Sequence, residues 1–183
     1  SQKVQGVSER FQEGLRILPV RIMRDGVLDE EMLRVILANV RLPDILRGDL
    51  NAQRNANHVG AQRLERLYRD HGLDLIDRAV SEILDRSEAR MRELIKAIPD
   101  GRYSFEDWLD SCAGECGPIK VAVDIDVEGD AITLDFSRSS DQVPVALNSY
   151  INYTRAYSLF AIKVFTDPLL PQNAGMIRPI TVK

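Results

Sequence analysis

IKVAVDIDVEGDAITLDF, residues Ile119 to Phe136, decides the fold class of the second half of the chain. Apolar and polar residues alternate over residues 119–127, as they do in a strand with one buried face. The acidic residues of the segment fall on the opposite face and in the turn, where we expect solvent. Glu128-Gly129-Asp130 is a hairpin turn signal, and residues 131–136 form the partner strand. The stretch therefore predicts an antiparallel hairpin.

Working back from this hairpin, another alternating stretch begins at Tyr103 and Phe105 and is expected to add a strand. Working forward, Thr154 is expected to cap a helix that Pro168 ends. Residues 177–183 then read as a last strand, in the middle of which the chain stops.

Helical spacing dominates the first half of the chain. Asp29 is a good N-cap for a first helix, whose apolar residues are Met32, Leu33, Ile36, Leu37 and Val40. Because Pro43 disfavours a helical conformation of the residue before it, we expect this helix to end near Val40. Gly48-Asp49 reads as a stop followed by a new cap, so a second helix is predicted from Leu50 to about Asp70.

A third helix is the longest regular element that the sequence predicts. Gly72 ends the helix before it, and Asp74 is expected to be its cap. Its apolar stripe runs at alternating three- and four-residue steps, through Ile76, Val80, Ile83, Ser87, Met91, Leu94 and Ile98. Pro99-Asp100-Gly101 closes it.

These elements predict an α+β fold. We expect three to four helices, including a long antiparallel helical pair, then a small antiparallel sheet of two to four strands with a further helix. The helical part should cover about residues 27–98, and the sheet with its helix about residues 102–183. Because the chain stops within a predicted strand, we expect residues 1–183 to be a single middle domain cut from a larger protein.

Composition excludes several functional classes. The chain has 183 residues, of which 44% are hydrophobic and 28% charged, enough to fill a core. Its net charge of -4 disfavours general binding to nucleic acid or to an anionic membrane. It has no apolar run of the roughly 18 residues that a membrane span needs and no signal pattern at its start, so we expect a cytoplasmic protein. Cys112 and Cys116 are expected to be an ordinary reduced pair, with no metal bound by this chain alone.

Candidate site residues come from the second predicted helix and its approach. Gln53 and Asn57 fall within the broad apolar arc of that helix, where an unpaired buried amide costs roughly 1–3 kcal/mol. Their partners could belong to an internal network, an interface or a ligand. Asp49 is expected to be a helix cap. Arg41 could bind an anion, although a carboxylate such as Asp44 or Asp49 is the simpler partner. Asn55 faces the other way.

No common catalytic motif occurs in the sequence. A phosphate-binding loop, GxGxxG, HExxH and GxSxG are all missing from it, so catalytic residues remain unknown at this stage.

Several longer motifs are more specific. FQEGLRILPVRIMRDG, ILANVRLPDILRGDLNAQRNAN, IPDGRY, ITLDFSRSSDQ and PQNAGMIRPITV occur in this order. By these motifs the chain resembles the central part of the hydantoinase B/oxoprolinase family almost end to end. The most specific part is Asn-Val-Arg-x-Pro at residues 39–43 followed by Gly-Asp-Leu-x-Ala-Gln at residues 48–53.

The resemblance implies a two-part enzyme that opens a small cyclic amide or imide, as 5-oxoprolinase and N-methylhydantoinase do. An A-type subunit or domain uses ATP with magnesium to phosphorylate the carbonyl oxygen, and the B-type part completes the reaction with a divalent metal. The related ketone carboxylases are an alternative, and a non-catalytic assembly domain that contacts the A-type partner or a second copy is another.

For this chain the resemblance implies a fragment that is inactive alone, since the metal-binding His and Asp residues are expected upstream of Glu13 and Gly-rich segments downstream of Lys183. The matching positions that could line the site or its interface are Arg41, Asp49, Gln53, Asn57 and Asn148. One departure is that Ser137-Arg138-Ser139 replaces a family pattern with a central glycine. That departure argues against a ligand-binding role for this loop.

Overall fold

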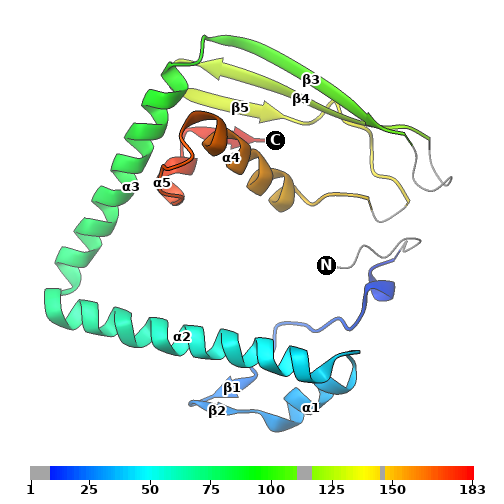
Figure 1. Ribbon diagram of the computed structural model, residues 1–183, viewed down its shortest axis with the longest axis vertical. Helices are drawn as coiled ribbons and strands as arrows, with labels where there is room; N and C mark the ends of the chain where they lie inside the picture. The colour runs from blue at the N-terminus through cyan, green and yellow to red at the C-terminus, as the bar shows by residue number, and fades with distance from the viewer. Residues whose placement is uncertain (1–8, 111–116, 145–146) are drawn as a thin grey trace. The chain divides into compact units, whose positions relative to one another are not determined.

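The computed structural model of the chain describes residues 9–110, 117–144 and 147–183 (Figure 1). Contacts divide the chain into a first unit, residues 1–73, and a second unit, residues 74–183. The division falls at the start of the third predicted helix, so most of this helix belongs with the sheet. Whether the chain is one excised domain stays a prediction.

The first unit contains a short 3-10 helix, η1 (Arg10–Glu13), and a small hairpin of β1 (Met23–Arg24) and β2 (Val27–Leu28). Asp25 and Gly26 form the hairpin turn with φ values of 49° and 80°. Two consecutive positive φ values are the geometry of a type I′ turn, which matches the twist of the paired strands. The turn predicted from Asp25-Gly26 is therefore confirmed.

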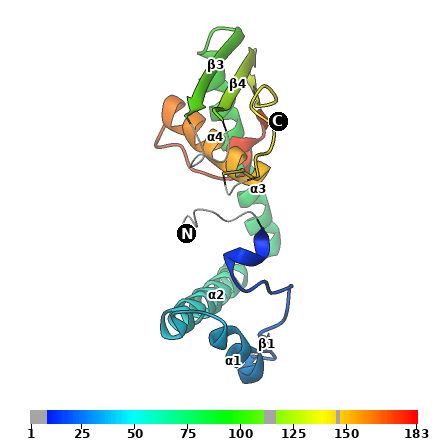
Figure 2. The same ribbon diagram turned by 90° about the vertical axis from the view of Figure 1, so that its right-hand side faces the viewer.

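Helix α1 (Glu30–Ala38) follows the hairpin, and α2 runs beside it in both views (Figures 1 and 2). The Asp29 side chain accepts a hydrogen bond from the Met32 N–H at 3.0 Å, as predicted for the N-cap. Leu33, Ile36 and Leu37 are buried and confirm the predicted apolar stripe.

Helix α2 spans Pro43–His71, so the break predicted at Gly48-Asp49 is wrong. Pro43 occupies the first turn, where its fixed φ and missing N–H favour a helix start, and it therefore begins a helix. A helix interior tolerates glycine at a cost of about 1 kcal/mol per residue, and α2 contains two such glycines, Gly48 and Gly60. Gly72 ends α2 as predicted, with a φ of 78° and its N–H donated to the carbonyl of Tyr68.

Helix α3 (Leu73–Lys96) buries only Ser87 and Met91 of its predicted stripe, together with Ile95, which the stripe did not include. Leu94 and Ile98 are partly buried, whereas Val80 and Ile83 are 50% and 55% exposed. The helix starts before Asp74, which lies in its first turn, so the predicted cap is wrong. The expected antiparallel pairing with α2 would join the two units and stays a prediction.

The sheet of the second unit has four strands in the order β3-β4-β5-β6: β3 (Gly101–Leu109), β4 (Ile119–Glu128), β5 (Ala131–Asp135) and β6 (Ile180–Val182). The hairpin of β4 and β5 turns at Gly129, which has a φ of 60°. β6 is parallel to β5, which corrects the purely antiparallel expectation. A parallel pair needs a long crossover, and the helices after β5 provide it.

Helices α4 (Ile151–Thr166) and α5 (Ala174–Ile177) form this crossover and lie on one side of the sheet (Figure 1). The N-cap of α4 is Tyr150 and Thr154 lies inside the helix, so the cap predicted at Thr154 is wrong. The core between helices and sheet consists of Met91, Ile95, Val127, Ile132, Leu134, Leu159, Ile162, Leu170, Met176 and Ile180.

The predicted α+β class and the strands of the second half are confirmed. Among the helices that the structure describes, none combines the length and apolar composition needed to cross a membrane.

Candidate functional site

Four of the five predicted site residues lie in the first unit. Arg41 follows α1, while Asp49, Gln53 and Asn57 succeed one another at four-residue spacing on α2. Residues spaced by four lie on the same side of a helix, so α2 presents a carboxylate followed by two amides. We call Asp49, Gln53 and Asn57 the polar stripe of α2.

The environment of the polar stripe differs from the expectation. No residue of α2 is buried, and Gln53 and Asn57 are exposed, so solvent can satisfy both amides. Within the described residues, the side chains of Arg41 and of the polar stripe form no hydrogen bond or ion pair. The expected pairing of Arg41 with Asp44 or Asp49 is therefore not formed. The role of these four residues in binding stays a prediction.

Asn148 lies in the second unit and makes local contacts. Its Oδ1 accepts from the Val143 N–H at 2.9 Å, and its Nδ2 donates to the Val143 carbonyl at 2.7 Å. The Asn148 amide thus bonds both backbone groups of Val143 and holds that residue near the start of α4. A ligand role for Asn148 stays a prediction.

A charged cluster that the sequence did not predict surrounds Asp124 on β4. Asp124 was expected on a solvated face but is only 3% exposed. Its carboxylate accepts from Arg138 Nη2 at 2.7 Å and Nε at 2.8 Å, from Arg102 Nη2 at 2.8 Å and from Ser104 Oγ at 2.6 Å. These donors, with Arg138 foremost, hold the pKa of the Asp124 carboxyl well below its ordinary value.

The loop after β5 explains how Arg138 reaches Asp124. The Ser139 hydroxyl accepts from the N–H of Ala122 and donates to its carbonyl, both at 3.0 Å. Ser140 exchanges bonds with the backbone of Lys120, through its Oγ and its own N–H, each at 2.9 Å. The loop thus continues the pairing along β4 beyond the end of β5. From this loop Arg138 bonds to the Asp124 carboxylate and lies 3.6 Å from Glu106.

We predict that Asp124→Asn lowers the melting temperature at pH 7 and flattens its dependence on acid pH. Because the folded pKa is lowered, the stabilisation is complete above the unfolded pKa of about 3.9 and is lost as pH falls through the folded value. Thermal unfolding followed by circular dichroism from pH 7 to pH 2 measures both effects. Asp126→Asn, at a half-exposed side chain, is the matched control and should keep the wild-type profile. Identical profiles for wild type and Asp124→Asn would contradict the prediction.

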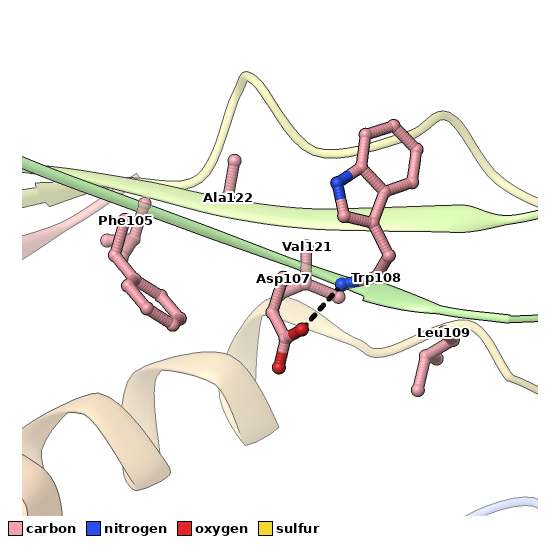
Figure 3. A pocket seen from close by; sticks show the side chains of 7 residues that line it. Phe105, Asp107, Trp108, Leu109, Val121 and Ala122 are labelled. Carbon is pink, nitrogen blue, oxygen red and sulfur yellow. Dashed lines mark hydrogen bonds between the residues drawn. The ribbon is translucent and has the colours of Figure 1, made fainter.

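A hollow of about 280 Å³ lies over the end of β3 and the start of β4 (Figure 3). Phe105, Asp107 and Leu109 point to one side of β3 and Trp108 to the other. The one charged group in its lining, Asp107, accepts the N–H of Trp108 at 2.8 Å. This hollow offers an apolar surface and no acid–base pair.

A larger hollow of about 580 Å³ lies between the end of α3, the sheet and α4. Its lining is apolar apart from one tyrosine hydroxyl: Ile98, Pro99, Tyr103, Ile125, Val127, Ile132, Leu134, Ala161, Ile162 and Phe165. The Tyr103 hydroxyl donates to the carbonyl of Pro99 at 2.7 Å. Such a lining can hold apolar groups but supplies no nucleophile.

In residues 9–110, 117–144 and 147–183, no group of three or more His, Cys, Asp or Glu side chains could hold a metal ion. Cys112 and Cys116 lie outside the described residues. The described residues therefore do not fit the divalent metal that the resemblance implies, and no metal-dependent step is assigned to them.

The family model described as Hydantoinase B/oxoprolinase matches residues 4–183. This chain belongs to the hydantoinase B/oxoprolinase family. The recognition from the sequence motifs is thereby confirmed. Family membership extends over both units of the chain.

Relatives in the family match nearly the whole chain. A Pseudomonas sp. (strain NS671) protein, provisionally named as the B-type component of a D-/L-hydantoinase, is 31% identical over 95% of the chain and 31% of its own length. The beta subunit of the Pseudomonas jessenii caprolactamase is 30% identical over 95% of the chain and 30% of its own length. The chain thus spans less than a third of these relatives.

Two solved structures share the fold. The crystal structure of ATP-dependent caprolactamase from Pseudomonas jessenii matches with a TM-score of 0.88 and 32% identity, over 96% of this chain and 30% of that chain. Nucleotide-free acetone carboxylase matches with a TM-score of 0.83 and 15% identity, over 96% of this chain and 25% of that chain. At this identity the second match shows the fold alone.

Proposed function

We propose that this chain is part of the B-type subunit of an ATP-dependent amidohydrolase that opens a cyclic amide or imide of the hydantoin or 5-oxoproline type. The observation that carries the proposal is the match to ATP-dependent caprolactamase, over both units and at 32% identity. The name of that enzyme denotes a lactam, which is a cyclic amide. We place the protein in the cytoplasm, where ATP is supplied.

The proposed reaction divides the chemistry between two subunits. An A-type partner uses ATP with magnesium to phosphorylate the carbonyl oxygen of the substrate. The phosphorylated oxygen is a better leaving group, and the carbon that bears it becomes open to attack by water. A divalent metal of the whole protein would be held by residues outside those described here, since these offer no set of ligands.

The role of this chain within the enzyme is assembly. The observation that favours it is α2, a helix of 29 residues with none buried. An exposed helix with a polar stripe can contact a partner subunit through its carboxylate and amides while the reacting groups lie elsewhere. On this proposal the isolated chain is inactive and the whole protein is active.

The deciding experiment compares the isolated chain with the full-length protein, each mixed with its A-type partner. ATP-dependent hydrolysis of hydantoin, N-methylhydantoin, 5-oxoproline and caprolactam is measured, with bicarbonate-dependent carboxylation of acetone and acetophenone as the alternative. We expect hydrolysis by the full-length complex only. Turnover by the isolated chain would refute the assembly role, and carboxylation without hydrolysis would move the protein to the ketone carboxylases.

The same complex tests the polar stripe. Gln53→Ala and Asn57→Ala in the full-length protein are expected to weaken binding of the A-type partner, measured by titration calorimetry, without changing turnover in the saturated complex. Asn55→Ala removes an exposed amide from the other side of α2 and is the matched control. Unchanged affinity in both stripe variants would exclude this face as the contact.

A further inference from the structure

One edge of β3 has no strand beside it among the described residues of the second unit. β3 is the first strand in the order β3-β4-β5-β6, so among the described strands only β4 pairs with it (Figure 2). It is nine residues long, each of its residues is exposed, and its sequence GRYSFEDWL contains no proline. A long edge strand without proline presents free N–H and C=O groups to another strand.

The pairing of the other strands identifies these free groups. Ile132 donates its backbone N–H towards the β6 side at 3.0 Å, so the odd-numbered residues of β5 bond to β4. Thr133 is opposite Asp126, so the even-numbered residues of β4 form the hydrogen bonds to β5. The odd-numbered residues of β4 therefore form the hydrogen bonds to β3. Because Tyr103 is opposite Ile125, the odd-numbered residues of β3 bond inwards. The N–H and C=O groups of its even-numbered residues therefore point to the open edge.

The protein itself caps one end of this edge. The outward N–H of Trp108 is bound by the Asp107 carboxylate at 2.8 Å (Figure 3). The residues whose outward N–H and C=O are both left for another strand are Arg102, Ser104 and Glu106. Ser104 lies at the centre of this set, so the free part of the edge is symmetric about it.

The side chains of this segment are complementary to themselves in an antiparallel register. With Ser104 opposite Ser104 of a second copy, Arg102 lies opposite Glu106 and Tyr103 lies opposite Phe105, each pair occurring twice. Opposite charges and aromatic pairs across antiparallel strands are both stabilising. Moving the axis to Phe105 would lose the ion pairs, and moving it to Glu106 would place like charges together.

The charges already present on this face continue across the axis. Arg102 binds Asp124 at 2.8 Å and Glu106 lies 3.6 Å from Arg138, and the side chains of Arg102 and Glu106 are 65% and 52% exposed. Each can therefore reach a second partner. Across the axis, positive and negative side chains would then alternate: Asp124 and Arg102 of one copy are followed by Glu106 and Arg138 of the other. Tyr103 and Phe105, which are 42% and 66% exposed, would be covered on the opposite face.

We propose that two copies of this protein associate by antiparallel pairing of their β3 edges about a two-fold axis at Ser104, forming one continuous eight-stranded sheet. The proposal does not depend on the reaction or on the A-type partner. It predicts a dimer of the full-length protein in the absence of ATP and substrate.

Disulfide cross-linking tests the register directly. In the full-length protein with Cys112→Ser and Cys116→Ser, Ser104→Cys places two thiols in a pair whose Cα atoms are about 5.5 Å apart, within the range of a disulfide. Glu106→Cys is the matched control, because its two thiols would be four residues apart along the strands, at about 14 Å. After mild oxidation we expect a covalent dimer for Ser104→Cys only. Equal cross-linking of both variants, or none, would overturn the proposed axis.

Sedimentation of full-length variants without added thiols provides the second measurement. Glu106→Pro removes an outward N–H from each copy and leaves the inward bonds to β4 intact, whereas Glu106→Ala keeps that N–H. We expect Glu106→Pro to weaken dimer association about tenfold or more relative to Glu106→Ala. A monomeric wild type whose Ser104 and Glu106 amides resist hydrogen exchange would show that another segment or subunit covers the edge, and would refute the proposal.

Discussion

Replacing Gly175 with alanine is expected to lower the free energy of unfolding of the second unit by about 3 kcal/mol, the upper range for an overpacked site. Gly175 lies in α5, where a Cβ would stand 2.6 Å from the backbone carbonyl carbon of Leu84 in α3. A backbone group cannot rotate away as a side chain can. The two helices must therefore separate to accept the methyl group.

The cost of separation is raised by the bonds that hold α5 in place. Asn173 caps α5 by accepting from the Gly175 and Met176 N–H groups, and its Nδ2 donates to Ser87 Oγ of α3 at 2.8 Å. Urea unfolding of the chain measures the change. Gly117→Ala, where a Cβ would meet nothing within 4 Å, is the control and should change stability by less than about 0.5 kcal/mol. Equal effects of the two substitutions would contradict the close approach.

Truncating Met91 to alanine is expected to cost about 2–5 kcal/mol. Met91 is fully buried in the core of the second unit, together with Ile95 and Met176. The substitution removes apolar contacts and leaves a cavity that helices packed on a sheet can close only in part. The loss should appear in the same urea unfolding measurement.

Glu93→Ala is the matched control for Met91. Glu93 lies on the exposed side of the same helix, with 69% of its side chain accessible and a long contact of 3.4 Å to Arg90. Exposed ion pairs contribute little, so its removal should cost less than about 0.5 kcal/mol. A loss for Met91→Ala as small as that for Glu93→Ala would show that the core can close around the missing side chain.

The strands were predicted well because their signal is local. The strand over residues 119–127 and the turn at Gly129 depend only on neighbouring residues, and both were confirmed. The solvated face expected opposite the apolar one was wrong, because Ala122 and Asp124 are buried whereas Val121 is exposed. The direction of β6 was missed because it depends on the crossover through α4 and α5. Gly48-Asp49 was misread because local stop signals do not exclude a helix that has already begun at Pro43.

In the candidate site, too, local features could be predicted and features that depend on distant residues could not. The motifs around residues 39–53 identified the family, because recognising a family requires only the order of residues in the sequence. Whether Gln53 and Asn57 are buried depends on what packs against α2, and the helical arc alone could not decide it. Asp124 was missed because its partners, Arg102 and Arg138, lie 22 and 14 residues away, beyond any local pattern.

The lack of any buried residue in α2 has a consequence for how the protein could be followed in solution. A helix stabilised mainly by its own backbone hydrogen bonds opens easily, because these local bonds add little free energy per turn. Its amide hydrogens should exchange with deuterium much faster than those of α3, whose second half is buried. A partner protein that binds to α2 would slow this exchange. The rate of deuterium exchange in α2 would therefore report whether the protein has assembled with a partner.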